Sequence, residues 1–305
     1  MKDKIYHMLC ADEQVQVCAI DGLQMVRRMR ELHNTSRVAT AALGRQLMMT
    51  SMMGSRLKNA DDRVSTIIKG DGYAGSMVCT AMPGGFVKGC VQDAEVELPP
   101  TAAGKLDVAG YVGHTGKLTV VRDLGFGDPY VGVCNLVSGE IAVDFAEYFT
   151  ASEQQPSLVY LGVRLEIETG EVRSAAGMLI QPLPGCEETV IETLTARSEE
   201  IAKLSAKLDE GEELLDAVNG ILVGMEPKVV QTYAPEYRCD CSRERIERAL
   251  ISVGASELTS IMIEQDGCAD VSCQFCGKTY HFDRQSLTAL LDAAQSVEKH
   301  DREES

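Results

Sequence analysis

The chain contains no tryptophan, and aromatic residues make up only 5% of its 305 residues. Single-stranded nucleic acids are held largely by bases that stack on aromatic side chains, so this composition argues against such a surface. Basic residues are also scarce, since 29 Lys and Arg face 46 Asp and Glu for a formal net charge of −17. Binding to a phosphate backbone depends on clustered Lys and Arg. The composition therefore predicts a protein that does not bind nucleic acid.

Long hydrophobic runs are missing as well. Met1–Ile5 is followed closely by Asp12 and Glu13, so the start of the chain lacks the pattern of a signal peptide or a membrane span. We expect a cytoplasmic protein that does not associate with membranes. The sequence contains no recognisable nucleotide-binding loop, catalytic triad or pair of catalytic carboxylates, so we do not expect an enzyme.

Cysteine, by contrast, is plentiful. Eleven cysteines would suggest a disulfide framework in a short secreted chain, but this chain is long and their number is odd. A reducing compartment fits better. We interpret six of them as small core residues, namely Cys10, Cys18, Cys79, Cys90, Cys134 and Cys186.

Four of the remaining cysteines form a C-x-C pair, Cys239 and Cys241, and a C-x-x-C pair, Cys273 and Cys276. Four thiolates complete the tetrahedral shell of zinc and leave no position for a substrate or a catalytic water. The spacing therefore predicts a closed site for one Zn²⁺ per chain. Cys268 and His281 flank the site, but the four-thiolate set is complete without them.

Residues 1–185 have the pattern of an α+β domain with a mostly antiparallel sheet. Strands are expected where apolar and polar residues alternate between Gly, Pro and Asp turns, most clearly in Val159–Ile167 with a turn at Thr169 and Gly170. Asn34–Lys58 has helical spacing, and we assign its paired methionines to the core. Gly70–Gly75 matches a dinucleotide-binding pattern, but no helix follows it, so we expect a hairpin turn.

Residues 186–226 form a predicted acidic helical linker, with Gly211 and Gly220 as expected breaks. Between Glu187 and Asp216 there are ten acidic and three basic residues. The acidic side chains of such a segment repel one another, so its helices are stable only if their apolar stripe packs against another part of the protein. That stripe comprises Ile191, Leu194, Ile201, Leu204, Leu208 and Leu215.

Residues 227–297 form the predicted cysteine module, and residues 298–305 a charged tail. Helices are expected over residues 242–253, 256–265 and 286–296. Few large apolar residues are available to this module, so metal binding should supply much of its folding free energy, on the order of 10 kcal/mol.

Two interpretations of the metal site follow from its chemistry. In the first, zinc only stabilises the fold. In the second, the thiolates react with an oxidant, close disulfides and can no longer hold the metal, which converts oxidation into local unfolding. The chemistry alone leaves both open.

The sequence closely resembles the redox-regulated 33 kDa heat-shock chaperones of bacteria over nearly its whole length. The C-x-C and C-x-x-C pairs match the family signature, and several upstream motifs match as well. These are residues 42–45, 68–72, 138–141 with Asp144 and Tyr148, 152–157, 176–177 and 181–184. Ala176 departs from the family pattern, which has a glycine there, and we expect this to alter a turn.

The resemblance implies a holdase chaperone that is inactive while its cysteines hold zinc. It implies that oxidation forms the disulfides Cys239–Cys241 and Cys273–Cys276, releases zinc and unfolds the linker, in which Ile201, Leu204 and Leu208 act as the switch. Exposed apolar surface would then hold unfolding client proteins without ATP, in an activated homodimer.

Two other functions remain as alternatives. A thiol-disulfide oxidoreductase would carry its C-x-x-C at the start of a helix in a βαβ unit, which this sequence does not predict. A constitutive zinc protein that binds partners through the module would keep its metal under oxidant. Release of zinc by an oxidant would exclude both alternatives.

Overall fold

The computed structural model describes residues 2–264 and 266–303. The chain divides into two compact units between Arg238 and Cys239. The sequence had placed residues 227–238 with the cysteine module, whereas Lys228–Tyr233 forms strand β10, which pairs with β1 (Lys4–Cys10) of the first unit. The first compact unit therefore contains both the predicted sheet domain and the predicted linker.

Two five-stranded antiparallel sheets form the framework of the first unit. The first sheet contains, in spatial order, β10, β1, β2 (Val15–Asp21), β9 (Val172–Pro182) and β8 (Leu158–Leu165). The second contains β5 (Val87–Val91), β4 (Ser76–Ala81), β3 (Arg63–Gly70), β6 (Gly116–Asp123) and β7 (Tyr130–Asn135). The fold class is thus the α+β arrangement that the sequence predicts. The glycine-rich segment after β3 is a hairpin turn into β4, also as predicted.

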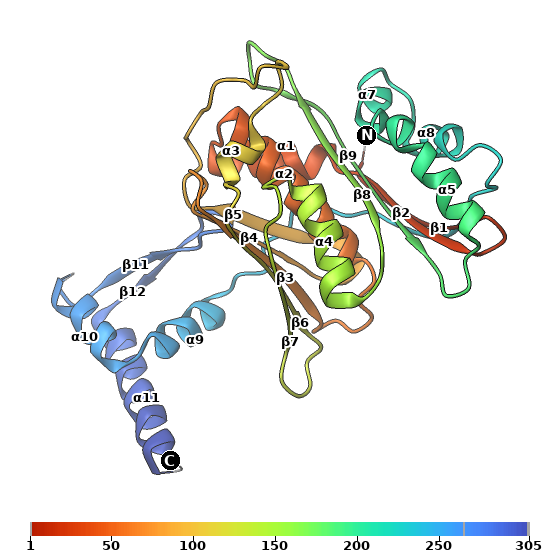
Figure 1. Cartoon of the computed structure of the whole chain (residues 1–305). Helices are drawn as coiled ribbons and strands as arrows, with labels where there is room; N and C mark the ends of the chain where they lie inside the picture. The colour runs from red at the N-terminus through yellow and green to blue at the C-terminus, as the bar shows by residue number, and fades with distance from the viewer. Residues whose placement is uncertain (1, 265, 304–305) are drawn as a thin grey trace. The chain divides into compact units, whose positions relative to one another are not determined.

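Helix α2 (Arg37–Gly54) packs against strands of both sheets and lies near the centre of the first unit (Figure 1). Its four paired methionines, Met48, Met49, Met52 and Met53, are all buried, which confirms the core assignment. Three further helices complete this layer, α1 (Leu23–His33), α3 (Val108–Val112) and α4 (Ile141–Glu153). The main hydrophobic core therefore lies between the sheets and around α2.

The helix predicted over Asn34–Lys58 has different ends in the structure. Asn34 has a left-handed backbone, with φ 47°, and ends α1 instead of beginning α2. The side chain of Ser36 accepts a hydrogen bond from the backbone N–H of Ala39 and so caps α2. The helix ends at Gly54, where an added Cβ would lie 2.5 Å from the Cβ of Ala81.

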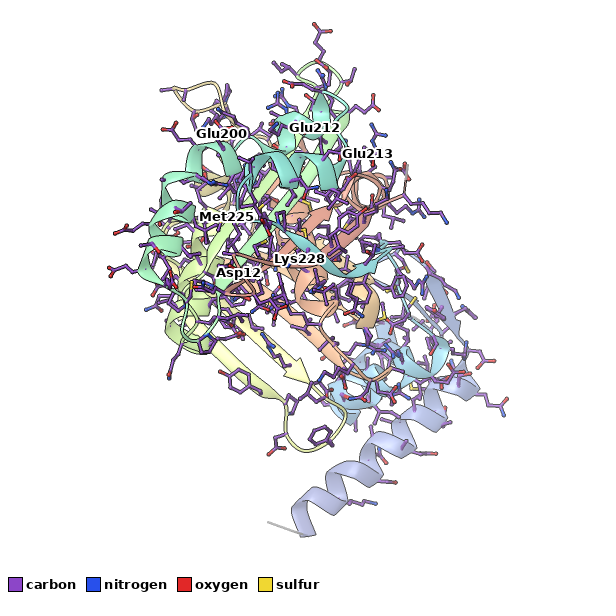
Figure 2. All side chains as sticks on the ribbon, turned by 90° about the vertical axis from the view of Figure 1, so that its right-hand side faces the viewer. Asp12, Glu200, Glu212, Glu213, Met225 and Lys228 are labelled. Atoms are coloured by element: carbon purple, nitrogen blue, oxygen red, sulfur yellow. The ribbon has the colours of Figure 1, made fainter. Side chains whose placement is uncertain are left out.

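The linker forms four short helices, α5 (Glu188–Ala196), α6 (Ser198–Ile201), α7 (Leu204–Asp209) and α8 (Leu214–Ile221). Figure 2 shows the linker over one face of the first sheet, with Glu200 in α6 and Glu213 just before α8, and then the chain passing Met225 and entering β10 at Lys228. Gly211 has φ 96° and separates α7 from α8, as predicted. The break expected at Gly220 comes one residue later, where α8 ends at Ile221.

A second apolar cluster joins the linker to this sheet face. The sheet contributes Met8, Cys10, Val17, Met178 and Ile180, and the linker contributes Leu194, Ile201, Leu204, Val218 and Ile221. The sheet is thus covered on both faces, by α1 and α2 on one side and by the linker on the other.

The second unit consists of α9 (Arg243–Val253), α10 (Ala255–Glu264), the hairpin β11 (Ala269–Ser272) and β12 (Thr279–Phe282), and α11 (Arg284–Glu303). The first two helices match the predicted ones, although predicted residue Gln265 lies outside the described residues. The last helix extends beyond the predicted residue 296 into the charged tail. No helix in the described ranges combines the length and apolar composition needed to cross a membrane.

Candidate metal centre

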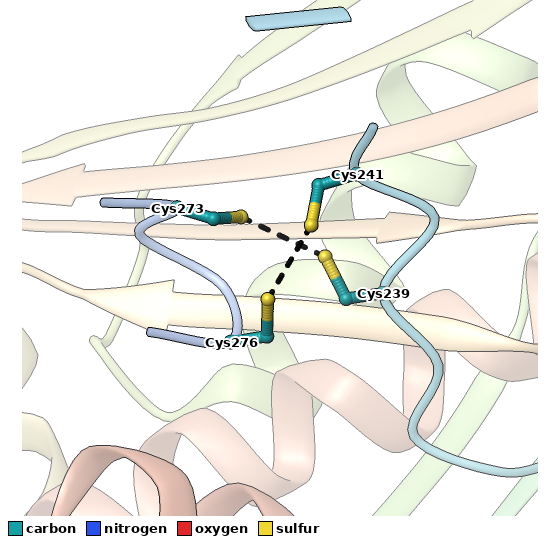
Figure 3. A group of neighbouring side chains, drawn as sticks. All are labelled: Cys239, Cys241, Cys273 and Cys276. Atoms are coloured by element: carbon teal, nitrogen blue, oxygen red, sulfur yellow. Dashed lines mark hydrogen bonds between the residues drawn. The ribbon is translucent and has the colours of Figure 1, made fainter. Parts of the chain in front are cut away.

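Four cysteine side chains meet in the second unit. Cys239 and Cys241 lie just before α9, and Cys273 and Cys276 lie in the turn between β11 and β12. Their four sulfur atoms all lie within 4.8 Å of one another. Figure 3 shows the two segments facing each other, with all four thiol groups pointing inward. The fold thus brings together the four cysteines that the sequence singles out.

The sulfur positions suit a tetrahedral ion. The Sγ atoms of Cys239 and Cys273 are 3.7 Å apart, and those of Cys241 and Cys276 are 3.5 Å apart. Zinc–sulfur bonds of about 2.3 Å at tetrahedral angles place neighbouring sulfur atoms about 3.8 Å apart. Four soft sulfur donors at this spacing fit zinc without rearrangement of the backbone.

Backbone hydrogen bonds shape the segment that carries the second pair. The backbone N–H groups of Cys276 and Gly277 both donate to the carbonyl oxygen of Cys273, at 3.3 and 2.8 Å. The N–H of Cys273 donates to the carbonyl oxygen of Lys278 at 2.9 Å. Gly277 has φ 71°, a conformation in which a side chain would be strained. The tight turn holds both thiols on one side.

Electrostatics favour one thiolate in this cluster even without a cation. Burial raises the pKa of Cys241, but hydrogen bonds from Tyr280 and from the other three thiols outweigh it and lower this pKa to about 7. The Tyr280 hydroxyl donates to Cys241 Sγ at 3.2 Å. Burial raises the pKa of Cys239 and of Cys276 above the ordinary range. A divalent cation would be needed to hold all four as thiolates.

The two flanking residues lie outside this cluster. Cys268 is exposed, and the Nδ1 atom of His281 lies 2.8 Å from a carboxylate oxygen of Asp270. Neither contributes an atom to the four-sulfur group.

Most cysteines of the first unit are buried, in surroundings that disfavour the thiolate form. Cys10, Cys18, Cys79 and Cys134 are buried, while Cys90 and Cys186 are partly buried. Burial raises the pKa of Cys10 to about 11 and that of Cys18 to about 12, and it also raises the pKa of Cys79 and Cys134. Because a thiol reacts with oxidants as the thiolate, these buried cysteines are poor targets near neutral pH.

Comparisons with known proteins match nearly the whole chain to one family. The family model described as Hsp33 protein matches residues 3–283. The chain belongs to the Hsp33 family. Curated relatives named 33 kDa chaperonin include one from Alkaliphilus metalliredigens, 41% identical over 96% of this chain and 99% of the relative. Another from Clostridium tetani is 39% identical over 95% of this chain and 98% of the relative.

A solved structure agrees with this assignment. The crystal structure of the 33 kDa chaperonin from Thermotoga maritima, also titled heat shock protein 33 homolog, is similar with a TM-score of 0.82. Its sequence is 33% identical, and the match covers 96% of this chain and 98% of that chain.

Several motifs that carried the family resemblance have structural roles in the first unit. Arg45 Nη1 donates to Glu140 Oε2 at 2.7 Å, which joins the motif in α2 to the motif before α4. Asp144 is fully buried and accepts hydrogen bonds from the backbone N–H groups of Val137 and Ser138. These motifs therefore order the loop that leads from β7 to α4.

Ala176 does not alter a turn, contrary to our expectation. It lies within β9, paired with Asp21 of β2 and Gly162 of β8, and is fully buried. The tighter position is Gly177, where an added Cβ would lie 2.9 Å from a methyl carbon of Ile20. The second residue of the motif, which is still glycine, is thus the one that needs to be small.

Sequence reasoning missed Tyr280 as a residue of the site. It lies 39 positions after Cys241, and no spacing rule links a tyrosine to a thiol. The pairing of β11 with β12 places Tyr280 opposite Val271, two residues before Cys273, the first cysteine of the turn. The sequence did contain one indication of its position, because alternating apolar residues in the short segment after Gly277 predict a strand that includes Tyr280.

Proposed function

We propose that this protein is a redox-regulated holdase chaperone that works without ATP. Membership of the Hsp33 family supports a heat-shock chaperone role. The observation that carries the redox proposal is the cluster of four thiols, which contains a cysteine with a lowered pKa, while buried thiols of the first unit have raised pKa values.

In the reduced state, Cys239, Cys241, Cys273 and Cys276 would hold one Zn²⁺. When bound, zinc supplies a cross-link between the two segments and keeps the thiols deprotonated. Among the described residues of the second unit, the apolar core has eight buried side chains, including Leu250, Leu258 and Phe282. The ligand residues would therefore contribute much of its stability, and the reduced protein would be inactive.

Oxidation would remove the ligands in pairs. Each disulfide takes two thiolates, and one peroxide molecule accepts their two electrons, together with two protons from the solvent, to become two water molecules. Following the family pattern, we assign the pairs Cys239–Cys241 and Cys273–Cys276. The sulfur contacts of 3.7 and 3.5 Å, between Cys239 and Cys273 and between Cys241 and Cys276, join the two segments instead. The assigned pairing therefore needs local rearrangement, which loss of the ligand set would permit.

The linker would connect this event to chaperone activity. Ile201 and Leu204 are buried against the first sheet, and Leu208 packs at the edge of the same cluster. We propose that these three residues form the switch. Release of the linker would expose both its apolar side chains and the sheet face beneath. That surface would bind unfolded or partly unfolded client proteins, and activated protomers would associate as a homodimer.

The test follows zinc release and the aggregation of a heat-unfolded client, before and after treatment with peroxide at mild heat. The wild type should release about one zinc per chain and gain holding activity, both reversed by a thiol reductant. Cys273→Ser combined with Cys276→Ser should abolish this oxidant control, because the second disulfide cannot form. Cys268→Ser is the matched control, since it removes an exposed thiol outside the cluster and should switch normally.

A double variant that still switched normally would contradict the mechanism. Zinc retained by the wild type under oxidant, with no holding activity, would favour the constitutive zinc protein instead.

A further inference from the structure

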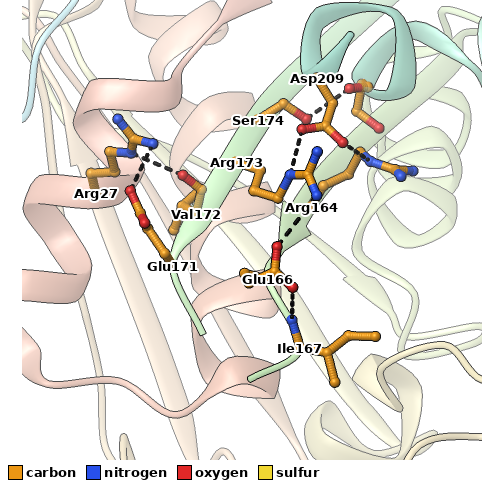
Figure 4. A network of polar contacts seen from close by, with 10 residues as sticks. Arg27, Arg164, Glu166, Ile167, Glu171, Val172, Arg173, Ser174 and Asp209 are labelled. Atoms are coloured by element: carbon orange, nitrogen blue, oxygen red, sulfur yellow. Dashed lines mark hydrogen bonds and ion pairs between the residues drawn. The ribbon is translucent and has the colours of Figure 1, made fainter. Parts of the chain in front are cut away.

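Helix α7 of the linker is held to the first sheet by a set of polar contacts at its C-terminal end. Asp209 Oδ1 accepts a hydrogen bond from Arg173 Nε at 2.8 Å, and its Oδ2 accepts one from Arg164 Nε at 3.1 Å. Figure 4 shows the two guanidinium groups approaching this carboxylate from neighbouring strands. The side chain of Asp209 is only 9% exposed, so the carboxylate is largely withdrawn from water.

The N-terminal end of α7 is held by uncharged groups. The hydroxyl oxygen atoms of Tyr160 and Ser205 are 2.6 Å apart, and Ser174 Oγ donates to the carbonyl oxygen of Ser205 at 2.7 Å. Gly162 permits this approach, because a Cβ there would lie 2.3 Å from the Tyr160 hydroxyl oxygen. Strands β8 and β9 thus bind α7 at both ends.

The neighbouring helix α8 is attached differently. It buries Leu214, Ala217, Val218 and Ile221 against the sheet, so its docking depends mainly on apolar contact, with one exposed ion pair at its start between Glu213 and Lys4 at 3.5 Å. Helix α7 has only six residues and buries two of them, Leu204 and Ser205. A helix of this length is unstable alone. Its stability therefore rests on the residues that hold its ends.

We propose that Asp209 and its two arginine partners form a charge latch, defined as Asp209, Arg164 and Arg173, that keeps α7 docked. Asp209 is then a positioning residue of the switch, and α7 is the linker helix whose release depends on charge. This proposal rests on the proposed function only for its effect on chaperone activity, since the latch itself is a property of the reduced fold.

The charges around the latch give it a distinctive response to salt. Arg173 also contacts Glu166 at 3.3 Å, and the side chains of Arg164 and Arg173 are half exposed. Added salt screens ion pairs that are open to solvent, with a Debye length of about 3 Å at 1 M. The apolar contacts of α8 are not weakened in this way. Salt should therefore loosen α7 while α8 stays docked.

The experiment measures hydrogen exchange of the linker amides in the full-length, reduced, zinc-loaded protein. Asp209→Asn keeps the size of the side chain but removes the charge that both arginines share. The amides of α7 should exchange on the order of tenfold faster, as expected for the loss of charge-assisted hydrogen bonds. Those of α8 should be unchanged. Raising the salt concentration should act on the wild type in the same direction but more weakly, because the Asp209 side chain is only 9% exposed, and should have less effect still on the variant.

Two further variants control for charge and for general loosening. Glu171→Gln breaks the ion pair with Arg27, which is also an exposed arginine–carboxylate pair of the first unit but includes no linker residue, and should leave α7 unchanged. Tyr160→Phe removes the hydrogen bond at the other end of α7. Its α7 amides should exchange faster than those of the wild type, and this exchange should still increase with salt because the latch is intact. Arg164→Gln should give an intermediate result, because Arg173 remains.

Equal exchange of α7 in wild type and Asp209→Asn would overturn the latch. Aggregation of a heat-unfolded client, measured on the same reduced samples, tests the link to activity. Faster exchange with gained holding activity would support the latch and the proposed function together. Faster exchange without holding activity would support the latch and count against the proposed role of linker release.

Discussion

Burial sets the charge of a histidine as well as that of the thiols. His7 lies in β1, with its Nε2 atom 2.7 Å from the Ser55 hydroxyl oxygen and 3.7 Å from Cys18 Sγ. Burial, followed by the positive charge of Arg56, lowers the pKa of His7 to about 4. The ring is therefore neutral in the folded protein under conditions where the same side chain in an unfolded chain takes up a proton.

This difference predicts a pH dependence of stability. The pKa of His7 is lower in the folded protein than in the unfolded chain. The contribution of His7 to the free energy of unfolding is therefore fully present above pH 6.5 and is lost as the pH falls towards 4. When the pH falls from 7 to 4.5, the free energy of unfolding of the wild type should decrease by about 2 kcal/mol more than that of His7→Gln. Urea unfolding followed by tyrosine fluorescence measures this, since the chain has no tryptophan. Parallel losses in both proteins would show that His7 does not cause the effect.

At the scale of elements, the linker stripe predicts which substitutions activate the reduced protein. Leu204→Ser together with Leu208→Ser should undock α7 and give holding activity without oxidant, because Leu204 is fully buried on the sheet. Loss of a buried leucine side chain typically lowers stability by about 2 to 5 kcal/mol. The measurement is suppression of client aggregation by the reduced variant.

Ile191→Ser offers a matched control for this prediction. Ile191 belongs to the same apolar stripe in the sequence but is 41% exposed in the structure, so its change should have little effect. A reduced Leu204 and Leu208 double variant as inactive as the wild type would remove these residues from the switch.

The strands from β3 to β9 were predictable because alternation and glycine turns mark them. The Thr169 and Gly170 turn, for example, joins β8 and β9 with φ 67° at the glycine. The break expected at Gly220 falls one residue later, after Ile221, which is buried in the apolar cluster between the linker and the sheet. Helix α1 was missed, although Met25, Val26 and Met29 line one buried face.

The metal site was easier to predict than its surroundings. The two cysteine pairs share a recognisable spacing, which limits the chemistry they can perform. The Tyr280 hydrogen bond and the Asp209 latch each join residues that are far apart in the chain, at separations of 39, 45 and 36 positions. Such contacts depend on strand pairing and helix docking, which no local pattern specifies.

At the scale of the whole molecule, the two units differ in what stabilises them. The first unit has an extensive apolar core around α2, whereas the core of the second, in the part that the structure describes, has eight buried side chains, Leu287 and Leu290 among them. Structural zinc typically contributes about 10 kcal/mol or more to small modules. The metal should therefore matter far more to the second unit.

Removal of the metal by a chelator under reducing conditions tests this difference. Amides in α9 and in the β11–β12 hairpin should lose protection from hydrogen exchange, while those of β3 and β4 in the first unit should keep theirs. The response should reverse when zinc is added back. A second unit that stayed protected after complete zinc removal would show that its small core is sufficient.

Strand β10 has a further consequence for the whole chain, because it lies between the linker and Cys239 in sequence. It is the edge strand of the first sheet, pairs with β1, and exposes its side chains from Lys228 to Thr232. If β10 detaches together with the linker, the seven residues of β1 become a free edge with unpaired backbone groups. Such an edge can pair with an extended segment of another chain. Since every polypeptide carries the same backbone groups, the edge would recognise the unfolded state of a protein and not its sequence.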